Sequence, residues 1–331
     1  MLDEPLDLDS LIGAWRLAFE AARKAFVAAR HDLPATELQV WNQRLLDERA
    51  ALVTLLGAFA RERHAKHLLV RLVASPWETR RLLGLPADAV ACVFNVDGVL
   101  VPSAAIHAEA WRVTFDEFLA RRIEPTGIPF ASFSVTVDYP RLVHGRTRAE
   151  SVRAFLASRG ITLPEGSPDD APGSETVGGL ANRKNLALRE RLAQHGVRAF
   201  EGARLYLQLA RDASMRCAVV SGSTNTRTLL DRAHLTELID DCVDGHTMRS
   251  EGLRRKPAPD MLVAACRHLG VEPRRTVVFE TTTDGVDAAC AAGFELVIAV
   301  NRDGAAPTLR THGASLVVAD LGELLERHLA A

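Results

Sequence analysis

Four short segments of this 331-residue chain combine acids, hydroxyls and a lysine in an order that could support chemistry. The first segment, NVDGVL, begins at Asn95 and places Asp97 two residues later, so both side chains point the same way in extended backbone. Ser221 opens SGSTNTR, Lys256 opens KPAPD, and Glu280 opens ETTTD. This set suits an anionic ligand, because hydroxyl and backbone donors hold oxygens and lysine neutralises charge.

The polar segments lie at or near the ends of apolar runs that we predict to be strands. The runs AVACVFNV, MRCAVVSG, TVVFETT, ELVIAVNR and SLVVAD are nearly continuously apolar, which is typical of strands covered on both faces. Helical patterns separate them. This alternation predicts an α/β fold, a doubly wound parallel sheet with helices on both faces. In such sheets ligands bind beyond the carboxyl ends of the strands.

We expect three units along the chain. Residues 1–84 are predicted to be an N-terminal helical extension, because their apolar residues fall on helical stripes. Residues 85–102 and 203–331 are predicted to form the α/β core. Residues 103–202 contain no comparable apolar strand, so they are predicted to form a helical cap inserted after the first strand. A homodimer through the extension is one alternative to packing on the same chain, since two long helices bury little surface alone.

Composition restricts the classes of function. The net charge is −2 and the two signs are interspersed, which argues against nucleic acid and an acidic membrane surface as partners. The apolar stretches are shorter than the ~18 residues of a membrane span. The acidic start of the chain lacks the basic and apolar regions of a signal peptide. Five cysteines without a CxxC pair indicate reduced, mostly buried thiols, and we expect a cytoplasmic protein.

The order and spacing of the four segments resemble the haloacid dehalogenase superfamily, and within it the β-phosphoglucomutase-like group with a helical cap. The first family motif is Asp-x-Asp-Gly-Val-Leu, compared with NVDGVL here. The second is a Ser or Thr closing the second strand, matched by Ser221, and the third is a Lys before Pro-x-Pro-Asp, matched by Lys256. The fourth is Glu-Asp followed by Gly-Val and an Ala-rich helix, compared with ETTTDGVDAACAAGF. The resemblance covers residues 85–330.

The predicted cap carries the resemblance further. IHAEAW resembles the segment leading into the cap, HGRTRAES resembles the loop whose arginine grips a substrate phosphate, and NRKN resembles the cap's Arg-Lys-Asn. An ordinary helix-face role for the histidine and tryptophan of IHAEAW is the alternative, as are solvated charges for the basic residues. The substrate-binding residues that the resemblance implies are Gly98, His107, Trp111, Arg148, Arg183, Lys184, Asn185, Gly222, Ser223 and Asn225.

Two departures from the family pattern bear on activity. In the family the first Asp of the first motif attacks phosphorus and binds magnesium, but Asn95 stands there, and an uncharged amide is a poor nucleophile. The Asp after the fourth motif's Glu is a second metal ligand, but Thr281 stands there. We therefore expect no cofactor, and magnesium only if Glu280 and the Asp97 carbonyl still bind it beside Thr281. Asp284 is expected to serve the following helix as an N-terminal acid.

Two functions remain open. The first is a protein that binds a phosphorylated small molecule, such as a sugar phosphate, between core and cap, with little or no magnesium-dependent aspartyl-phosphate hydrolysis. The alternative is an active hydrolase, phosphatase or phosphomutase of the family, or an enzyme with a divergent reaction. There Asp97 would act as general acid/base while Ser221 and Lys256 hold the phosphate. The matching losses at Asn95 and Thr281 favour natural divergence over one isolated substitution.

Overall fold

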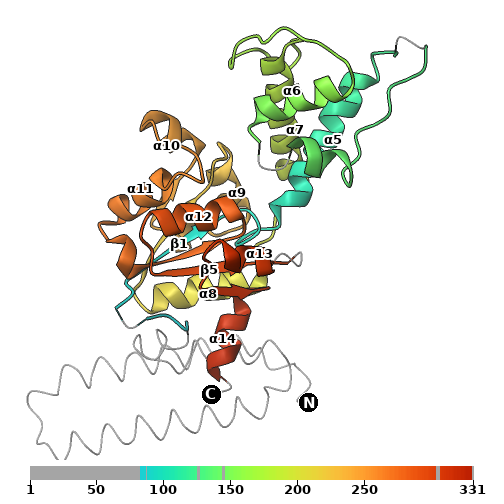
Figure 1. Cartoon of the computed structure of the whole chain (residues 1–331). Helices are drawn as coiled ribbons and strands as arrows, with labels where there is room; N and C mark the ends of the chain where they lie inside the picture. Colours follow the sequence, from blue (N-terminus) through green and yellow to red (C-terminus); the bar gives the residue numbers. More distant parts are fainter. Residues whose placement is uncertain (1–82, 87, 125–126, 144–145, 303–305, 330–331) are drawn as a thin grey trace, which may run out of the picture.

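A six-stranded parallel sheet forms the centre of the chain (Figure 1). The computed structural model describes residues 83–86, 88–124, 127–143, 146–302 and 306–329. The strand order is β3-β2-β1-β4-β5-β6. The strands are β1 (Ala91–Asn95), β2 (Arg216–Val220), β3 (Asp241–Val243), β4 (Thr276–Glu280), β5 (Leu296–Val300) and β6 (Leu316–Val318). The predicted doubly wound parallel sheet is confirmed, with one edge strand, β3, that the apolar runs did not reveal.

The side chains of β1 alternate between two hydrophobic cores on opposite faces of the sheet. Cys92 and Phe94 belong to the cluster that contains residues of α8 and α14, whereas Ala91 and Val93 belong to the cluster that contains residues of α11 and α12. This two-residue alternation is the geometry of a strand covered on both faces. The core helices are α8 (Glu201–Asp212), α9 (Thr226–Arg232), α10 (Gly245–Ser250), α11 (Asp260–Leu269), α12 (Thr283–Ala291), α13 (Ala306–Thr311) and α14 (Gly322–Leu329), with 3-10 turns η2 (Thr236–Leu238) and η3 (Pro273–Arg275).

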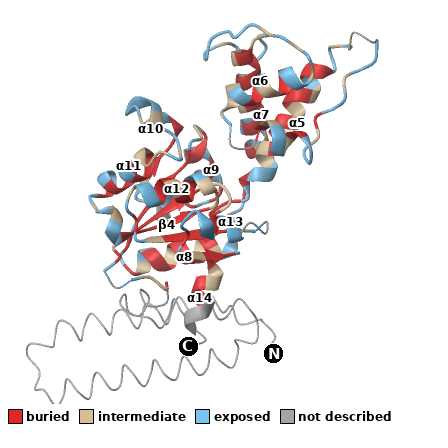
Figure 2. Cartoon of the chain, viewed as in Figure 1, coloured by how far each residue is buried: buried red, intermediate tan, exposed pale blue. Residues whose placement is uncertain are grey.

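Most of the segment between β1 and α8 packs around a third hydrophobic cluster (green in Figure 1), while Ala110 and Leu188 of the same segment belong to the first cluster. It contains α5 (Ser103–Leu119), the π-helical turn η1 (Tyr139–Val143), α6 (Arg148–Ser158) and α7 (Val177–His195). Phe115 and Phe155 stack with ring centroids 3.7 Å apart in its centre. Buried residues line the inner sides of these helices in Figure 2, as they line the strands of the sheet. The predicted inserted helical segment is therefore present, while the exact boundaries of the three units stay predictions.

Several smaller expectations can be compared with the described residues. None of the five cysteines, all of which lie in the described part of the chain, forms a disulfide; four are buried and Cys290 is exposed. Asp284 lies in the first turn of α12, as expected of an N-terminal acid. Among the described residues, none of the helices has the length and apolarity to cross a membrane. The predicted helices of the N-terminal extension, and with them the dimer alternative, lie outside the described residues except for residues 83 and 84.

Candidate active site

The order of the strands brings three of the four polar segments together. β1 lies between β2 and β4, with Asn95 paired in register with Val220 and Phe94 with Phe279. The side chains that end these strands therefore meet at one edge of the sheet, where Ser221 follows β2 and Glu280 ends β4. The third segment, KPAPD, supplies Lys256 from the loop before α11, and its ammonium reaches the same edge.

Asn95 connects the first and fourth segments through its side-chain amide. Its Nδ2 donates one hydrogen bond to the Asp97 carbonyl oxygen at 2.9 Å and another to Thr281 Oγ1 at 3.1 Å. Its Oδ1 accepts from Lys256 Nζ at 3.4 Å. The partners set the orientation of the amide, because an ammonium can only donate and a carbonyl oxygen can only accept. Only 9% of Asn95 is exposed, so all three contacts are made largely away from water.

Lys256 and Glu280 form the principal ion pair of the site. Lys256 Nζ binds Glu280 Oε1, and the Glu280 side chain is completely buried. The other carboxylate oxygen, Oε2, is buried without a hydrogen-bond partner. It faces the first turn of α12, where any side chain on Gly285 would collide with it. The glycine thus gives the buried carboxylate its space, and the lysine charge that could face a phosphate is already partly neutralised by Glu280.

Asp97 presents its carboxylate between two hydroxyl groups. Ser103 at the start of α5 donates to Oδ1, and Ser221 lies 3.4 Å from Oδ2. The turn after Asp97 requires Gly98 at φ +78°, a conformation that other residues rarely adopt. The Gly98 amide bonds the carbonyl of Val101 at 2.9 Å, so the chain turns sharply from the strand into the first cap helix. This turn fixes the acid at the carboxyl edge of the sheet, beside the first helix of the inserted segment.

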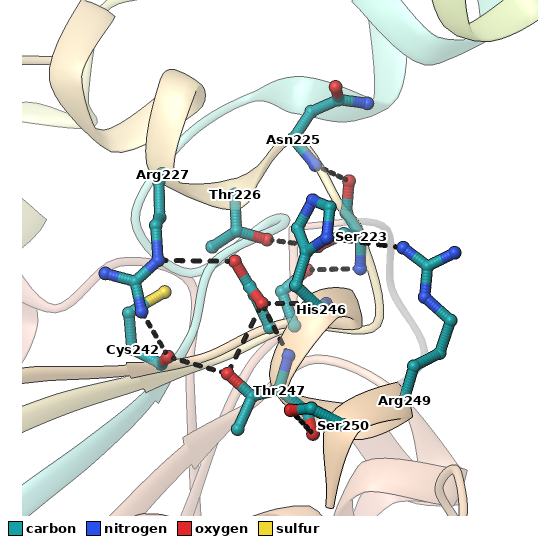
Figure 3. A network of polar contacts seen from close by, with 11 residues as sticks. Ser223, Asn225, Thr226, Arg227, Cys242, His246, Thr247, Arg249 and Ser250 are labelled. Atoms are coloured by element: carbon teal, nitrogen blue, oxygen red, sulfur yellow. Dashed lines mark hydrogen bonds and ion pairs between the residues drawn. The ribbon is translucent and has the colours of Figure 1, made fainter.

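The loop after β2 is held by a polar network that Figure 3 shows from close by. Ser223 donates its backbone N–H to Ser221 Oγ at 3.2 Å and accepts from the Asn225 N–H at 3.1 Å. Below the loop, buried Asp244 caps α10 and forms an ion pair with Arg227 at 3.5 Å. These contacts hold the loop that carries Gly222, an exposed glycine whose missing side chain leaves the backbone accessible.

The cap directs two cations towards the same edge of the sheet. Lys184 is only 3% exposed, and its Nζ lies 3.0 Å from His107 Nδ1 and 5.4 Å from the centroid of the Trp111 ring. Burial, with Arg148 nearby, lowers the pKa of Lys184 to about 7, although the Asp97 carboxylate opposes the shift. Burial also lowers the pKa of His107 to about 4, so the imidazole is neutral and can accept a hydrogen bond from the ammonium.

Arg148 is the second cap cation and has an unsatisfied donor. Its Nη1 is buried without a hydrogen-bond partner. Burial lowers the pKa of Arg148, and the charges of Arg249 and Arg189 lower it further. Arg189 of α7 and Arg249 of α10 are exposed, and each of them has a hydrogen-bond contact of its own. An anion bound beside Arg148 would satisfy its unpartnered Nη1, because an unpaired buried donor is costly.

Of the remaining predicted binding residues, one connects the cap to the core and the others make contacts within the cap. Asn185 Oδ1 accepts from Asn225 Nδ2 at 2.6 Å, a direct hydrogen bond between cap and core. Arg183, by contrast, points to Glu117 within the cap, with Nη2 2.8 Å from Oε2. Trp111 is 3% exposed and stacks on Phe115 inside the cap. This position favours a role in packing beside Lys184 over direct contact with a substrate. Substrate contacts by these residues stay predictions.

The residues present do not fit a magnesium site. The Asp97 carbonyl and Thr281 Oγ1 both accept from the Asn95 Nδ2, and Thr281 stands where the family pattern has its second metal-binding Asp. Turning the amide over would direct its N–H groups at the Lys256 ammonium. Within the described residues, no group of three or more His, Cys, Asp and Glu side chains could hold a metal ion. The single unpartnered oxygen of Glu280 does not replace the hard, charged oxygen shell that magnesium requires.

Three residues of the site were not identified from the sequence. Ser103 contacts Asp97, Arg189 Nε lies 3.2 Å from Asn225 Oδ1, and Arg249 approaches Arg148 from the core. Ser103 could have been suggested by its place at the start of the first cap helix, a few residues after the acid. Nothing in the local patterns around the two arginines distinguishes them from solvated charges on helices.

Comparisons with known proteins identify the family and the fold of this chain. The haloacid dehalogenase-like hydrolase family matches residues 90–293. A β-phosphoglucomutase of Mycobacterium tuberculosis is 46% identical over 248 residues, covering 74% of this chain and 95% of that protein. The solved structure of a HAD family hydrolase from Deinococcus radiodurans, with bound phosphate and sodium, is 30% identical with a TM-score of 0.52, covering 72% of this chain and 94% of that one. The solved structure of a β-phosphoglucomutase from Clostridium difficile shows the same fold, with a TM-score of 0.54 and 19% identity. The match covers 73% of this chain and 100% of that one.

Proposed function

Since this chain belongs to the haloacid dehalogenase-like hydrolases, in their β-phosphoglucomutase-like group, we propose that it binds a phosphorylated sugar in the cleft between core and cap. We further propose that any reaction there proceeds without an aspartyl phosphate on residue 95. The observation that carries the second statement is the Asn95 amide, which donates to the Asp97 carbonyl and to Thr281. The amide lacks the negative oxygen that would attack phosphorus.

The phosphate end of the ligand is expected beside Ser221 and Lys256. The Ser221 hydroxyl, the exposed Gly222 backbone and the Lys256 ammonium supply donors at one edge of the sheet. The bound phosphate in the Deinococcus radiodurans relative supports a phosphate site in this fold. A phosphate dianion would compete with Glu280 for Lys256, which makes that ion pair the element most affected by binding.

The cap is expected to hold the other part of the ligand. Arg148 carries a buried donor without a partner, and Lys184 carries an ammonium that burial destabilises. An anionic or oxygen-rich group between them would satisfy both. Asn185 of the cap is already hydrogen-bonded to Asn225 of the core, so cap and core are connected before such a ligand binds.

Asp97 is the residue placed to move a proton. Its Oδ2 lies 3.4 Å from Ser221 Oγ, so a ligand oxygen held at Ser221 would be close to the carboxylate. A carboxylate within hydrogen-bond reach of a reacting hydroxyl can act as general base, and as general acid in the reverse step. Proton transfer of this kind contributes roughly 10²–10⁴-fold, far less than the whole acceleration of a phosphatase, so we expect slow turnover at most.

An active hydrolase, phosphatase or phosphomutase with robust turnover is the second candidate, and the relatives favour it. The 46% identity to a β-phosphoglucomutase extends over nearly the whole of that protein. On this candidate function, Asp97 would serve as general acid/base in a reaction that does not use residue 95 as its nucleophile.

A panel of sugar phosphates, assayed for phosphate release and for isomerisation with and without magnesium, tests both candidates. The wild-type chain is compared with Asp97→Ala and with the double variant Asn95→Asp, Thr281→Asp. We expect saturable binding but weak, magnesium-independent turnover in the wild type, and magnesium-dependent turnover in the double variant. Robust magnesium-dependent turnover of the wild type, abolished by Asp97→Ala, would establish the second candidate instead.

A further inference from the structure

A cavity lies at the opposite edge of the sheet from the phosphate site. Its volume is about 620 Å³, within the range of roughly 300–1,000 Å³ typical of small-molecule sites. The amino ends of β1 and β2, the carboxyl end of α11 and the turn η3 form its walls. Its lining residues are Val90, Arg216, Arg267, Gly270, Val271, Glu272, Arg274 and Arg275.

Four of these lining residues are arginines, and only one is an acid. This concentration of positive charge contrasts with the chain as a whole, whose net charge is −2. Guanidinium groups are planar forks that bind phosphate oxygens through two parallel hydrogen bonds. Val90 and Val271 add an apolar wall between them. The guanidinium groups and the apolar wall suit a small anion with several phosphates, which would compete with the nearby carboxylates of Glu251, Glu272, Glu295 and Asp88.

Two of the arginines are structural and two can change partner. Arg216 donates to the Leu269 carbonyl at the end of α11, and Arg275 Nε lies 3.3 Å from the Asp88 carbonyl, so both are tied to backbone. Arg267 pairs with Glu251, and Arg274 pairs with Glu272. Those two pairs are exposed, and exposed pairs contribute little free energy. A phosphate group can displace them at small cost.

Room for the ligand depends on the glycine that ends α11. Gly270 has φ +65°, and a side chain there would come within 3.4 Å of the Arg216 guanidinium. The glycine allows the helix to end beneath the arginine and keeps the guanidinium at the cavity wall. The same elements carry the phosphate site at their other ends, because β1 ends at Asn95 and β2 ends just before Ser221.

We infer that this cavity binds a small polyphosphate anion, either a bare polyphosphate or the phosphate tail of a nucleotide, at a site separate from the cleft. The inference does not depend on the proposed function. Binding at the cavity and binding at the cleft occupy opposite edges of the sheet, so they can be measured separately.

Hydrogen–deuterium exchange of the full chain, titrated with tripolyphosphate or with ATP, tests the inference. Peptides covering residues 263–276 report on the cavity, and peptides covering residues 93–102 report on the cleft. We expect protection of the cavity peptides, with the half-protecting concentration raised at least tenfold by the double variant Arg267→Ala, Arg274→Ala. Arg153→Ala, which removes an exposed paired arginine in the cap, is the matched control and should change nothing.

A second double variant, Arg267→Lys with Arg274→Lys, separates loss of binding from loss of folding. It keeps the charge and removes the bidentate forks, so we expect an intermediate affinity and unchanged thermal unfolding. Stronger protection by ATP than by tripolyphosphate would identify a nucleotide, and equal protection would identify the phosphates alone. No protection of the cavity peptides at millimolar concentrations of either probe, or equal protection in the alanine variant, would overturn the inference.

Discussion

Magnesium should stabilise the double variant Asn95→Asp, Thr281→Asp and leave the wild-type chain unaffected. In the wild type, the Asn95 Nδ2 satisfies two oxygens, at 2.9 and 3.1 Å, that a cation would otherwise contact. Each such hydrogen bond is worth about 1 kcal/mol net. Without metal, the variant loses both bonds and directs a carboxylate at the Asp97 carbonyl, so we expect it to unfold about 2 kcal/mol more easily than the wild type.

The variant restores what magnesium requires, namely two carboxylates beside a carbonyl oxygen. With about 10 mM magnesium and a dissociation constant of about 0.1 mM, binding adds about 2.7 kcal/mol to the free energy of unfolding. For a protein of this size about 2–4 °C accompanies each kcal/mol, so the melting temperature should rise by about 5–10 °C. Thermal unfolding with and without magnesium, using calcium as a comparison, measures the shift directly.

Asn182→Asp is the matched control for this experiment. Its Nδ2 also connects two backbone carbonyls, those of Pro168 and Asp170, both at 2.8 Å, but it does so within the cap. We expect it to lower the melting temperature without making it sensitive to magnesium. A magnesium shift of 5 °C or more in the wild-type chain, or no shift in the double variant, would refute the reasoning that the amide excludes the cation.

Three further predictions concern the charged and polar groups of the cleft. Because the pKa of Lys184 is lowered to about 7, the unfolded chain binds more protons than the folded one between about pH 7 and 10.5. The free energy of unfolding of the wild type should therefore rise with pH across that window, relative to that of Lys184→Met. Denaturant titrations at about pH 7 and 9.5 would measure the difference. Lys256→Met leaves Glu280 buried without its cation, so we expect a loss of about 3–5 kcal/mol, which the added change Glu280→Gln should largely recover in the same titrations. Asn225→Ala removes the two side-chain hydrogen bonds that Asn225 makes with Asn185 and Arg189 of the cap. X-ray scattering should then report a larger radius of gyration without ligand, whereas an unchanged radius would mean that other contacts hold the cap.

The sheet could be predicted from the sequence because its central strands are buried on both faces. Five apolar runs identified five strands and placed Ser221 and Glu280 correctly at their ends. The sixth strand, β3, has three residues at the edge of the sheet and is too short to show a pattern. The helical segment after β1 was equally predictable, since its described part lacks apolar runs of that kind and packs around its own cluster.

The candidate site was less predictable, because side-chain partners depend on elements far apart in the chain. Asn95 and Thr281 were recognised as departures from the family pattern, but their mutual hydrogen bond spans 186 positions and leaves no local signal. For Arg183, the substrate contact that NRKN predicts stays a prediction. The structure adds a pairing with Glu117 on the neighbouring helix, which no local pattern indicated.

The hydrogen bond between Asn95 and Thr281 also couples the two positions energetically. An aspartate at position 95 alone would set a carboxylate against the Asp97 carbonyl, without the second carboxylate that would help to hold a cation. An aspartate at position 281 alone would remove a hydroxyl that donates to that same carbonyl at 3.3 Å. We therefore expect the two substitutions to be epistatic, because cation binding requires both changes in one chain.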